Sequence, residues 1–501
     1  MKTILVLNMG MKSIRSIIFD VKGNKLASAS IPIETSLKGE TVTQQPQEWW
    51  EKACVVIRES IAVAGGIAID FLTATSSSSC LVCVDRQGEA LMSCMMVSDK
   101  RAKAESEMIK EQTRFALNPS LMLPKALWVK QHEKKIFDNI YKFLSPNDYL
   151  IEKLTGQYVT DYMNASKWFY DIEKRTYPKE LLQKVGIKEA MLPDVTEPGK
   201  YVGNITEHAA KQTGLSRQTK VVVSAYDAIC SFIGSGVLRE GEASDVSGTV
   251  TVFRAASVNK RNLRGDKIQQ IPYYEGGIHI IGGSNNMGGG LIEWVKQCYY
   301  QNESLPYELM EKDANEADIG AGGVIFLPYL LGERAPIWDS DARGVFFGLE
   351  RMHTRKEMTR AVFESTGFID LDMIAAIEET GITISRIRLS GGLARINLIS
   401  QIKADITGRE IQVLSEFETT SMGAAMMVFY GQGIYASLQE AVDCFVKVRM
   451  VVCPDLTNHR KYQKLYQLYK ETYEVLKPMF PKRMEMTKQL YGNKGIKIEN
   501  L

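Results

Sequence analysis

Short apolar runs broken by glycine turns restrict what this chain can fold into more than any other feature. The run at 3–8 ends at the turn Met9-Gly10-Met11, and a second run at 14–20 is followed by an alternating stretch at 25–31. Short runs joined by Gly and Asn turns are typical of a β-meander. A strand, a glycine turn and another strand recur at 243–253. The recurrence predicts two related α/β domains, each with a glycine turn at its ligand side.

Composition sets the class of protein. The 501 residues are 45% hydrophobic and 24% charged, with a formal net charge of +2. These values are ordinary for a globular protein, and they give no reason to expect nucleic acid or a membrane surface as partner. The apolar run at the N-terminus is too short for a signal peptide, and no run reaches the length of a membrane span. We therefore expect a cytoplasmic protein.

Eight cysteines are spread thinly along the chain, which favours a reducing compartment over a disulfide framework. Cys80 and Cys83 form a CxxC motif within an apolar run. No second Cys/His pair stands at metal spacing, so buried strand residues are the favoured interpretation. A redox or zinc role is the minor alternative.

The periodicity also predicts individual elements. Pro46 favours the start of a helix over 47–64, and Val221 to Val223 is typical of a buried strand. The polar composition of 482–501 predicts a frayed tail. Further expected elements are helices over 289–300, 396–407 and 419–430 and a strand over 386–390.

Two kinds of residue point to phosphoryl transfer, which needs a phosphate cradle, a metal and a base. Glycine turns let backbone N–H groups approach phosphates, and the candidates are Gly10, Gly248-Thr249 and Gly391-Gly392. No Walker A motif is present, and no GxGxxG follows a strand, which disfavours a P-loop or dinucleotide fold. Asp227 follows an apolar strand and opens a helix, where a carboxylate serves either as a base or as a simple helix N-cap.

Several long motifs resemble the FGGY family of carbohydrate kinases, from about residue 3 to about residue 445. The most specific is FLPYLLGERAPIWDSDARGVFFGL at 326–349, which resembles xylulose and gluconate kinases. Other matching segments are 44–50, 145–150, 154–166, 224–249, 282–294, 390–413 and 421–425. The resemblance implies an α/β protein of two ribonuclease-H-like domains, of the actin/hexokinase superfold, that close on a central cleft. We expect a sugar-binding domain at 1–245, a nucleotide-binding domain at 246–480 and a polar tail at 481–501.

The resemblance also implies roles for individual residues. Asp227 matches the general base, which raises the odds of that role well above those of a helix cap. The Trp-x-Asp-x-Arg segment near the sugar corresponds to Asp99 and Arg101, with Val97 in place of Trp. Ser78 and Ser79 are the other candidate sugar contacts. The implied ATP-binding residues are Gly10, Met11, Lys12, Gly248, Thr249, Gly288, Gly391, Gly392, Ala394 and Asn397, and the implied Mg²⁺ residues are Asn8 and Asp227, through water.

Departures from the family pattern leave an alternative open. Asn8 and Met11 stand where the family has the Asp and Thr of Asp-x-Gly-Thr, so magnesium affinity should fall. A non-catalytic or weakly active sugar-binding or regulatory protein is the alternative to a kinase. Xylulose kinases also have Gln-Met-His-Gly where this chain has Ser77 to Cys80. The expected substrate is a ketose, polyol or sugar acid, with a xylulose-like pentulose first and gluconate next, and a homodimer is the default assembly.

Overall fold

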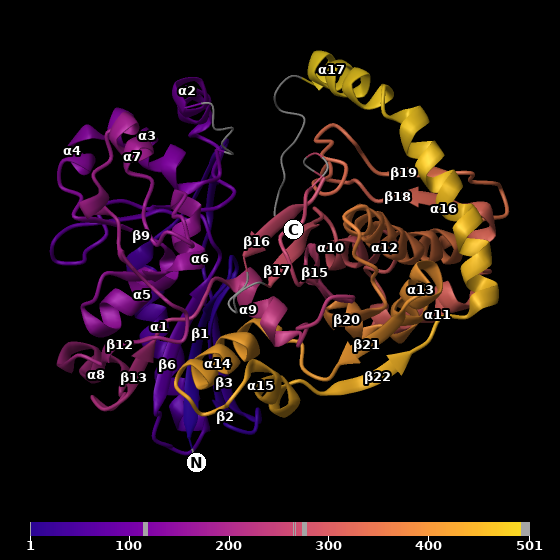
Figure 1. Cartoon of the computed structure of the whole chain (residues 1–501). Helices are drawn as coiled ribbons and strands as arrows, with labels where there is room; N and C mark the ends of the chain where they lie inside the picture. The colour runs from indigo at the N-terminus through magenta and orange to yellow at the C-terminus, as the bar shows by residue number, and fades with distance from the viewer. Residues whose placement is uncertain (1, 114–118, 264, 266, 273–277, 492–501) are drawn as a thin grey trace. The chain divides into compact units, whose positions relative to one another are not determined.

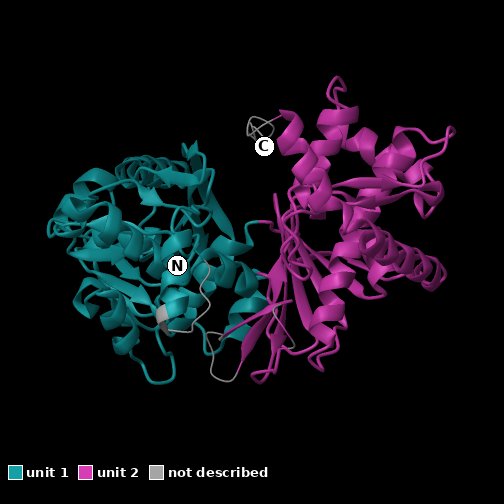
Figure 2. Cartoon of the chain, turned by 90° about the horizontal axis from the view of Figure 1, so that it is seen from above, with its two compact units in different colours: residues 1–234, 418–446 teal, residues 235–417, 447–501 magenta. Residues whose placement is uncertain are grey.

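A computed structural model describes residues 2–113, 119–263, 265, 267–272 and 278–491. By internal packing the chain forms two compact units, coloured separately in Figure 2. Unit 1 comprises residues 1–234 and 418–446, and unit 2 comprises residues 235–417 and 447–501. The chain thus returns to unit 1 late in the sequence. A boundary between continuous domains near residue 245 stays a prediction.

Unit 1 is built on a six-stranded sheet with the order β12-β13-β6-β1-β2-β3 (Figure 1). The first three strands form the expected antiparallel meander, while β6 lies parallel to β1 on its other side. Every residue of β1 and β6 is buried, including the threonines and the serine of β6. The strands are β1 (Thr3–Met9), β2 (Ser13–Asp20), β3 (Lys25–Pro32), β6 (Phe71–Ser76), β12 (Tyr201–Asn204) and β13 (Lys220–Val222).

Two helices of unit 1 approach each other backbone to backbone. They are α9 (Asp227–Gly234) and α14 (Thr419–Gly431). A Cβ added at Gly234 would lie 1.8 Å from the carbonyl oxygen of Thr419. A Cβ at Gly423 would lie 1.8 Å from the carbonyl oxygen of Cys230, so only glycine permits this approach. The contact ties 418–446 to the N-terminal residues.

Unit 2 contains a seven-stranded sheet with the order β16-β17-β15-β14-β20-β21-β22. Strands β14 and β15 form a hairpin, and β14, β20 and β21 are parallel to one another. The strands are β14 (Glu242–Ser247), β15 (Thr251–Ser257), β16 (Gln269–Pro272), β17 (His279–Ser284), β20 (Arg386–Gly391), β21 (Glu410–Leu414) and β22 (Val448–Val452). The helices are α10 (Gly289–Tyr299), α11 (Pro306–Glu316), α12 (Arg355–Glu378), α13 (Asn397–Thr407), α16 (Leu456–Leu476) and α17 (Met479–Tyr491).

The remaining elements are smaller or cover the sheets. The helices are α1 (Pro46–Val63), α2 (Lys103–Thr113), α3 (Met122–His132), α4 (Lys134–Phe137), α5 (Pro146–Thr155), α6 (Tyr162–Ala165), α7 (Lys179–Val185), α8 (Glu207–Thr213) and α15 (Leu438–Phe445). The strands are β4 (Ser36–Lys38), β5 (Thr41–Gln44), β7 (Val82–Val84), β8 (Cys94–Met95), β9 (Lys142–Leu144), β10 (Val159–Asp161), β11 (Asp194–Thr196), β18 (Ile325–Leu327) and β19 (Val345–Phe347). Short 3₁₀ helices occupy Ser166–Trp168, Glu189–Met191, Ala321–Gly323 and Leu393–Arg395.

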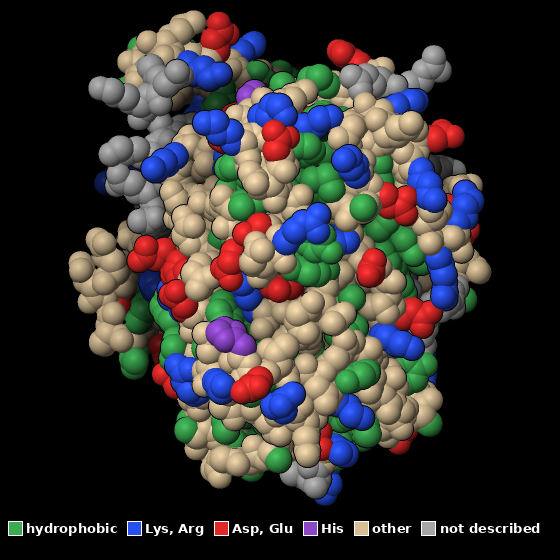
Figure 3. All heavy atoms as spheres, turned by 90° about the vertical axis from the view of Figure 1, so that its left-hand side faces the viewer, with side chains coloured by type: hydrophobic (Ala, Val, Ile, Leu, Met, Phe, Trp, Pro, Cys, Tyr) green, Lys and Arg blue, Asp and Glu red, His purple; other side chains and the backbone are tan. Residues whose placement is uncertain are grey.

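The elements expected from periodicity are confirmed within one or two residues at each end. Cys80 and Cys83 are both buried free thiols, but only Cys83 lies in a strand, β7, whereas Cys80 lies in the loop before it. The C-terminal segment differs from a frayed tail, because α17 continues to Tyr491, and 492–501 lie outside the described residues. Within the described part of the chain no helix has the length and apolarity to cross a membrane. On the face of unit 1 drawn in Figure 3, basic and acidic side chains are interspersed.

Candidate active site

Asp227 is the first residue of α9, directly after the loop that leaves β13. The carbonyl of Tyr226 accepts the amides of Ile229 and Cys230, so the helix starts here. The Asp227 carboxylate accepts a hydrogen bond from Ser77 Oγ, which lies 2.9 Å from Asp227 Oδ2. It is only partly buried, which leaves it accessible. The sequence analysis named Ser78 and Ser79 as sugar contacts, and the structure adds Ser77 as the serine that contacts the carboxylate.

The loop after β6 is shaped from below by a buried lysine. Ser79 has a left-handed backbone (φ 61°) and is 5% exposed. Its carbonyl accepts from Lys125 Nζ at 2.7 Å, and the same ammonium donates to the carbonyl of Met96 at 2.7 Å. Burial lowers the pKa of Lys125. Lys125 therefore joins the serine loop to the segment leading to Asp99, and Ser78 keeps a partly accessible position between them.

Asp99 and Arg101 form one rigid pair. Asp99 is fully buried, and its Oδ2 accepts from the amide of Val42 at 2.9 Å and from Arg101 NH2 at 2.6 Å. Asp99 Oδ1 accepts from Arg101 Nε at 2.9 Å. The guanidinium also lies 4.8 Å from the ring centroid of Trp128. Because the carboxylate oxygens are used within the protein, Asp99 orients Arg101, which is the group with donors left to offer a ligand.

Lys167 is a site residue that the sequence analysis missed. Its Nζ lies 3.3 Å from the hydroxyl of Tyr226 and 4.7 Å from the centroid of that ring. Tyr226 directly precedes Asp227, so Lys167 contacts the residue next to the candidate base in the chain. Lys167 directly follows the matched segment 154–166, and nothing in the local pattern separates it from a surface lysine.

The first glycine turn lies between β1 and β2. Asn8 is 2% exposed at the end of β1, and its Nδ2 donates to Ser421 Oγ at 3.1 Å. The carbonyl of Met11 accepts from Gln44 Nε2 at 2.9 Å, and its side chain packs partly against the core of unit 1. Gly10 donates its amide to the carbonyl of Ser13 at 3.0 Å, and Lys12 is exposed. Backbone contacts therefore hold this turn in place without the threonine hydroxyl that Met11 replaces.

A buried polar network supports the serine loop from the other side. Ser76 Oγ donates to Asn147 Oδ1 at 2.9 Å, and Ser145 with Asp148 forms a capping box at the start of α5. Burial raises the pKa of Asp148 to about 7 and that of Asp161 to about 6. The motif SPND is therefore structural: it fixes the residue that follows β6.

In unit 2, the candidate phosphate loop is the turn between β14 and β15. Gly248 and Thr249 are exposed. The carbonyl of Gly248 accepts from the amide of Gly289 at 2.7 Å, and that of Thr249 accepts from Gly288 at 3.0 Å. A Cβ at Gly288 would lie 2.6 Å from Thr251 Oγ1, so glycine allows this contact. The first turn of α10 thus holds the loop through its carbonyls, which leaves the loop's own amides to face a ligand.

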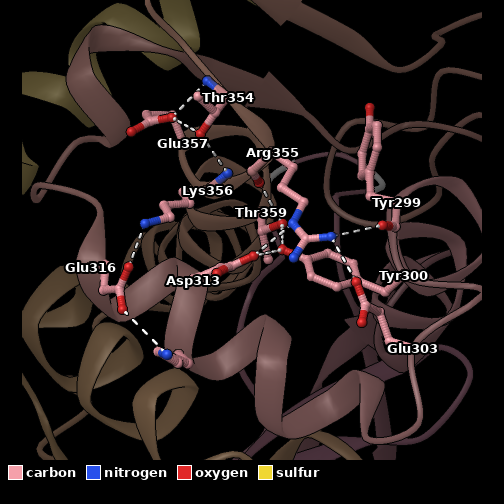
Figure 4. A network of polar contacts seen from close by, with 11 residues as sticks. Tyr299, Tyr300, Glu303, Asp313, Glu316, Thr354, Arg355, Lys356, Glu357 and Thr359 are labelled. Carbon is pink, nitrogen blue, oxygen red and sulfur yellow. Dashed lines mark hydrogen bonds and ion pairs between the residues drawn. The ribbon is translucent and has the colours of Figure 1, made fainter.

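The far end of α10 is fixed by the polar network of Figure 4. Arg355 Nε donates to Asp313 Oδ2 at 2.9 Å, and its guanidinium lies 4.5 Å from the ring centroid of Tyr300. Tyr300 donates its hydroxyl to the same carboxylate at 2.9 Å, and Arg355 NH1 reaches Glu303 Oε1 at 3.0 Å. These contacts join α10, α11 and α12, so α10 is a firm support for the loop.

The candidate adenosine-side segment follows β20. Gly391 has φ 88°, and a Cβ there would lie 2.4 Å from the carbonyl oxygen of Ser247. Gly392 and Asn397 are exposed, whereas Ala394 is fully buried. Arg449 NH2 donates to the carbonyl of Ala394 at 3.0 Å and to Asn397 Oδ1 at 3.1 Å. Ala394 therefore anchors the segment in the core, and Gly392 and Asn397 are its exposed residues.

Direct metal ligands are scarce. Among the described residues no group of three or more His, Cys, Asp and Glu could hold a metal ion. Magnesium that arrives with ATP takes most of its ligands from phosphates and water and needs only one or two from protein. The hydrogen bond from Asn8 Nδ2 to Ser421 leaves Asn8 Oδ1 as the group's acceptor. Asn8 and Asp227 fit such a role in donor chemistry, and their ligation of magnesium stays a prediction.

Comparison with known families identifies the family to which this chain belongs. The N-terminal domain model of the FGGY family of carbohydrate kinases matches residues 3–234, and its C-terminal domain model matches residues 246–431. Together these ranges cover most of the chain. The chain belongs to the FGGY family of carbohydrate kinases.

Relatives and solved structures agree with this membership. The FGGY chain is 28% identical over 493 residues to a xylulose kinase of Bacillus subtilis, covering 96% of this chain and 98% of that protein. It is 26% identical over 461 residues to a gluconokinase of the same organism, covering 88% and 89%. A gluconate kinase and a ligand-bound xylulose kinase, both from Lactobacillus acidophilus, superpose with TM-scores of 0.87 at 26% identity, and each alignment covers 96% of this chain.

The FGGY membership confirms the expected fold and reaction class. The chain has the two-domain actin/hexokinase-like α/β fold, and it is a carbohydrate kinase that takes ATP as cosubstrate. The structure gathers Asp227, Ser77 and the serine loop in unit 1, and Gly248, Gly288 and Gly391 in unit 2. The roles of the individual site residues stay predictions.

Proposed function

We propose that the protein transfers the γ-phosphate of Mg·ATP to a hydroxyl of a ketose, polyol or sugar acid, with Asp227 as general base. A xylulose-like pentulose is the first candidate substrate and gluconate the second. The observation that carries the proposal is the hydrogen bond from Ser77 Oγ to Asp227 Oδ2 at 2.9 Å. An aliphatic hydroxyl donating to this carboxylate is the contact that a sugar hydroxyl makes before it is deprotonated.

In the proposed reaction, Asp227 takes the proton from the sugar hydroxyl as the oxygen attacks the γ-phosphorus. The bond from that phosphorus to the β–γ bridging oxygen breaks, and ADP leaves. The protein contributes mainly position and charge, because phosphoryl transfer needs little covalent help. Arg101, held by Asp99, and the serine loop, held by Lys125, orient the sugar.

The nucleotide would be held by the groups assembled in unit 2. The exposed Gly248-Thr249 loop offers backbone amides to the phosphates, and Gly392 with Asn397 lines the adenosine side. Magnesium, when bound with ATP, neutralises charge on the phosphates. Asn8 offers it an uncharged oxygen, so we expect the protein to bind magnesium more weakly than it would with an aspartate at this position.

The substrate candidates come from the relatives, which are named xylulose kinase and gluconokinase. The candidate sugar contacts of unit 1 include the hydroxyl of Ser77, which donates to Asp227, and the cation Arg101, while the cation Lys167 contacts Tyr226. Hydroxyls suit a polyol chain, whereas the cations suit a carboxylate. Both candidates therefore enter the test.

The test is coupled ADP release with Mg·ATP against a panel of ketopentoses, ketohexoses, tetruloses, polyols and sugar acids, for wild type and Asp227→Asn. We expect one or a few sugars to give turnover. Loss of a general base costs about 10²–10⁴-fold, so we expect kcat to fall by about 10³-fold in Asp227→Asn with little change in KM for ATP.

A matched control is Asp138→Asn, an exposed carboxylate on the surface of unit 1 that pairs with Lys134. It should keep wild-type turnover. Near wild-type turnover in Asp227→Asn would remove Asp227 as the base. A wild type that binds Mg·ADP and sugars but turns none of the panel over would favour a protein that kept the fold and lost the reaction.

A further inference from the structure

A buried ion cluster lies beneath the candidate phosphate loop. It consists of Lys403 on α13, Asp245 on β14 and Asp370 on α12, all at most 1% exposed. Lys403 Nζ donates to Asp245 Oδ2 and, at 2.7 Å, to Asp370 Oδ2. One ammonium group thus joins a strand and two helices of unit 2.

The other carboxylate oxygen of Asp245 is hydrogen-bonded to Ser247, at the base of the candidate phosphate loop. Ser247 Oγ donates to Asp245 Oδ1 and lies 3.1 Å from Thr251 Oγ1. Ser247 and Thr251 are paired across the hairpin, so they form the base of the turn that carries Gly248 and Thr249. Asp245 therefore connects Lys403 to the base of this turn.

The same cluster reaches the adenosine-side segment by two routes. Lys403 lies on α13, the helix that begins at Asn397. Ser247 also pairs with Gly391 on the neighbouring parallel strand, where the close approach of the two backbones permits only glycine. The phosphate loop and the adenosine-side segment therefore share Ser247 and the cluster as a common support.

Stability alone does not account for three buried ionisable side chains. Replacing a buried ion cluster with uncharged residues is often neutral or stabilising, because the desolvation cost is large. Burial and repulsion from Asp245 raise the pKa of Asp370 well above its ordinary value, and Asp370 Oδ1 is a buried oxygen with no hydrogen-bond partner in the structure. The position of the cluster beneath both candidate nucleotide segments suits a role in fixing their relative geometry.

We propose that Lys403, through Asp245 and Asp370, is a positioning residue that holds the phosphate loop in register with the adenosine-side segment, so that one nucleotide engages both. The inference rests on the proposed function for the assignment of these two segments to ATP. The cluster itself does not touch the nucleotide in this proposal.

The decisive variant neutralises the whole cluster: Lys403→Met with Asp245→Asn and Asp370→Asn. It removes the fixed geometry without leaving an unpaired charge. Isothermal titration of wild type and variant with Mg·ADP and with adenosine separates the two segments. We expect Mg·ADP to bind about tenfold or more weakly in the variant, and adenosine to bind within about twofold of wild type, because adenosine needs only one segment.

The matched control is Arg360→Met with Glu364→Gln, which neutralises a second buried ion pair of unit 2, within α12. Arg360 and Glu364 contact Tyr462 and Gly320 and neither of the two segments. Mg·ADP should bind this variant as it binds wild type. An equal loss in the control would overturn the proposal, since any loosening of unit 2 would then produce it.

Failure of the proposed function can be told apart from failure of the positioning role. If wild type binds no Mg·ADP, the proposed function fails, whereas wild-type affinity in the neutralised cluster overturns only the positioning role. If circular dichroism shows the triple variant unfolded, Ser247→Ala takes its place, because it removes only the hydroxyl that links Asp245 to the turn. We expect it to bind Mg·ADP about threefold or more weakly with adenosine unchanged, and unchanged Mg·ADP affinity would overturn the proposal.

Discussion

The two units bury charged side chains in different ways. In unit 1, Lys125 donates to two backbone carbonyls, and Asp99 accepts a backbone amide as well as Arg101. In unit 2, Lys403 pairs with two carboxylates, those of Asp245 and Asp370. Charges that bond to backbone fix the path of a loop, whereas charges that bond to other side chains fix the distance between elements. The candidate sugar-binding loops of unit 1 therefore depend on loop shape, and the candidate nucleotide-binding segments of unit 2 on the spacing of strands and helices.

The difference predicts unequal costs of removal, and the largest belongs to Lys125. Lys125→Met leaves the buried carbonyl of Ser79 without the lysine donor, at about 1–3 kcal/mol, and leaves that of Met96 with the amide of Asp99 as donor. We expect the free energy of unfolding to fall by about 3 kcal/mol, measured by urea denaturation. Lys403→Met with Asp245→Asn and Asp370→Asn, which neutralises all three bonded side chains together, should cost about 1 kcal/mol or less. Equal losses in the two variants would remove the distinction between the units.

The next effect is a pH dependence in unit 1. Burial raises the pKa of Asp148 to about 7, so between about pH 4 and pH 7 the folded chain holds a proton that the unfolded chain releases. The folded state binds more protons in this window, and the free energy of unfolding therefore falls as pH rises through it. Asp148→Asn lacks this proton but keeps one acceptor oxygen for Ser145.

We expect wild type to lose about 1–2 kcal/mol relative to Asp148→Asn between pH 5 and pH 8, measured by urea denaturation at each pH. Asp161, whose pKa is also raised, is present in both proteins, and because its charge helps to raise the pKa of Asp148 the difference reports the Asp148 carboxyl together with this interaction. Asp138→Asn, at an exposed position, should show the wild-type slope. A wild-type slope in Asp148→Asn as well would mean that this carboxyl is not protonated in the folded state.

The sequence revealed features that depend on local signals and missed those that depend on contacts between distant residues. Strands β1 to β3 and helices α10, α13 and α14 were predictable, because hydrophobic periodicity and glycine turns are local signals. Asp227 was predictable from its place after a strand and from the family motif. Lys125 and Lys403 were not, since a lysine in a helical pattern is normally exposed, and their partners lie at least 29 residues away in sequence. Ser77 was passed over in favour of its neighbours because a run of four serines gives no signal of which one faces the carboxylate.

The smallest predicted effect tests the first glycine turn, where the chain departs from its family. Met11→Thr restores the threonine of the Asp-x-Gly-Thr pattern, and the turn should keep its shape because Gln44 and Thr35 hold the Met11 carbonyl. One added hydrogen bond to a charged group contributes about 1.5 kcal/mol, so we expect KM for ATP to fall by up to about tenfold, measured by coupled ADP release. Met11→Leu, which keeps the apolar packing without a hydroxyl, should match wild type. If Met11→Thr changes neither KM for ATP nor kcat, the turn does not face a phosphate in this protein, and the nucleotide is held by the unit 2 loops with no contribution from residue 11.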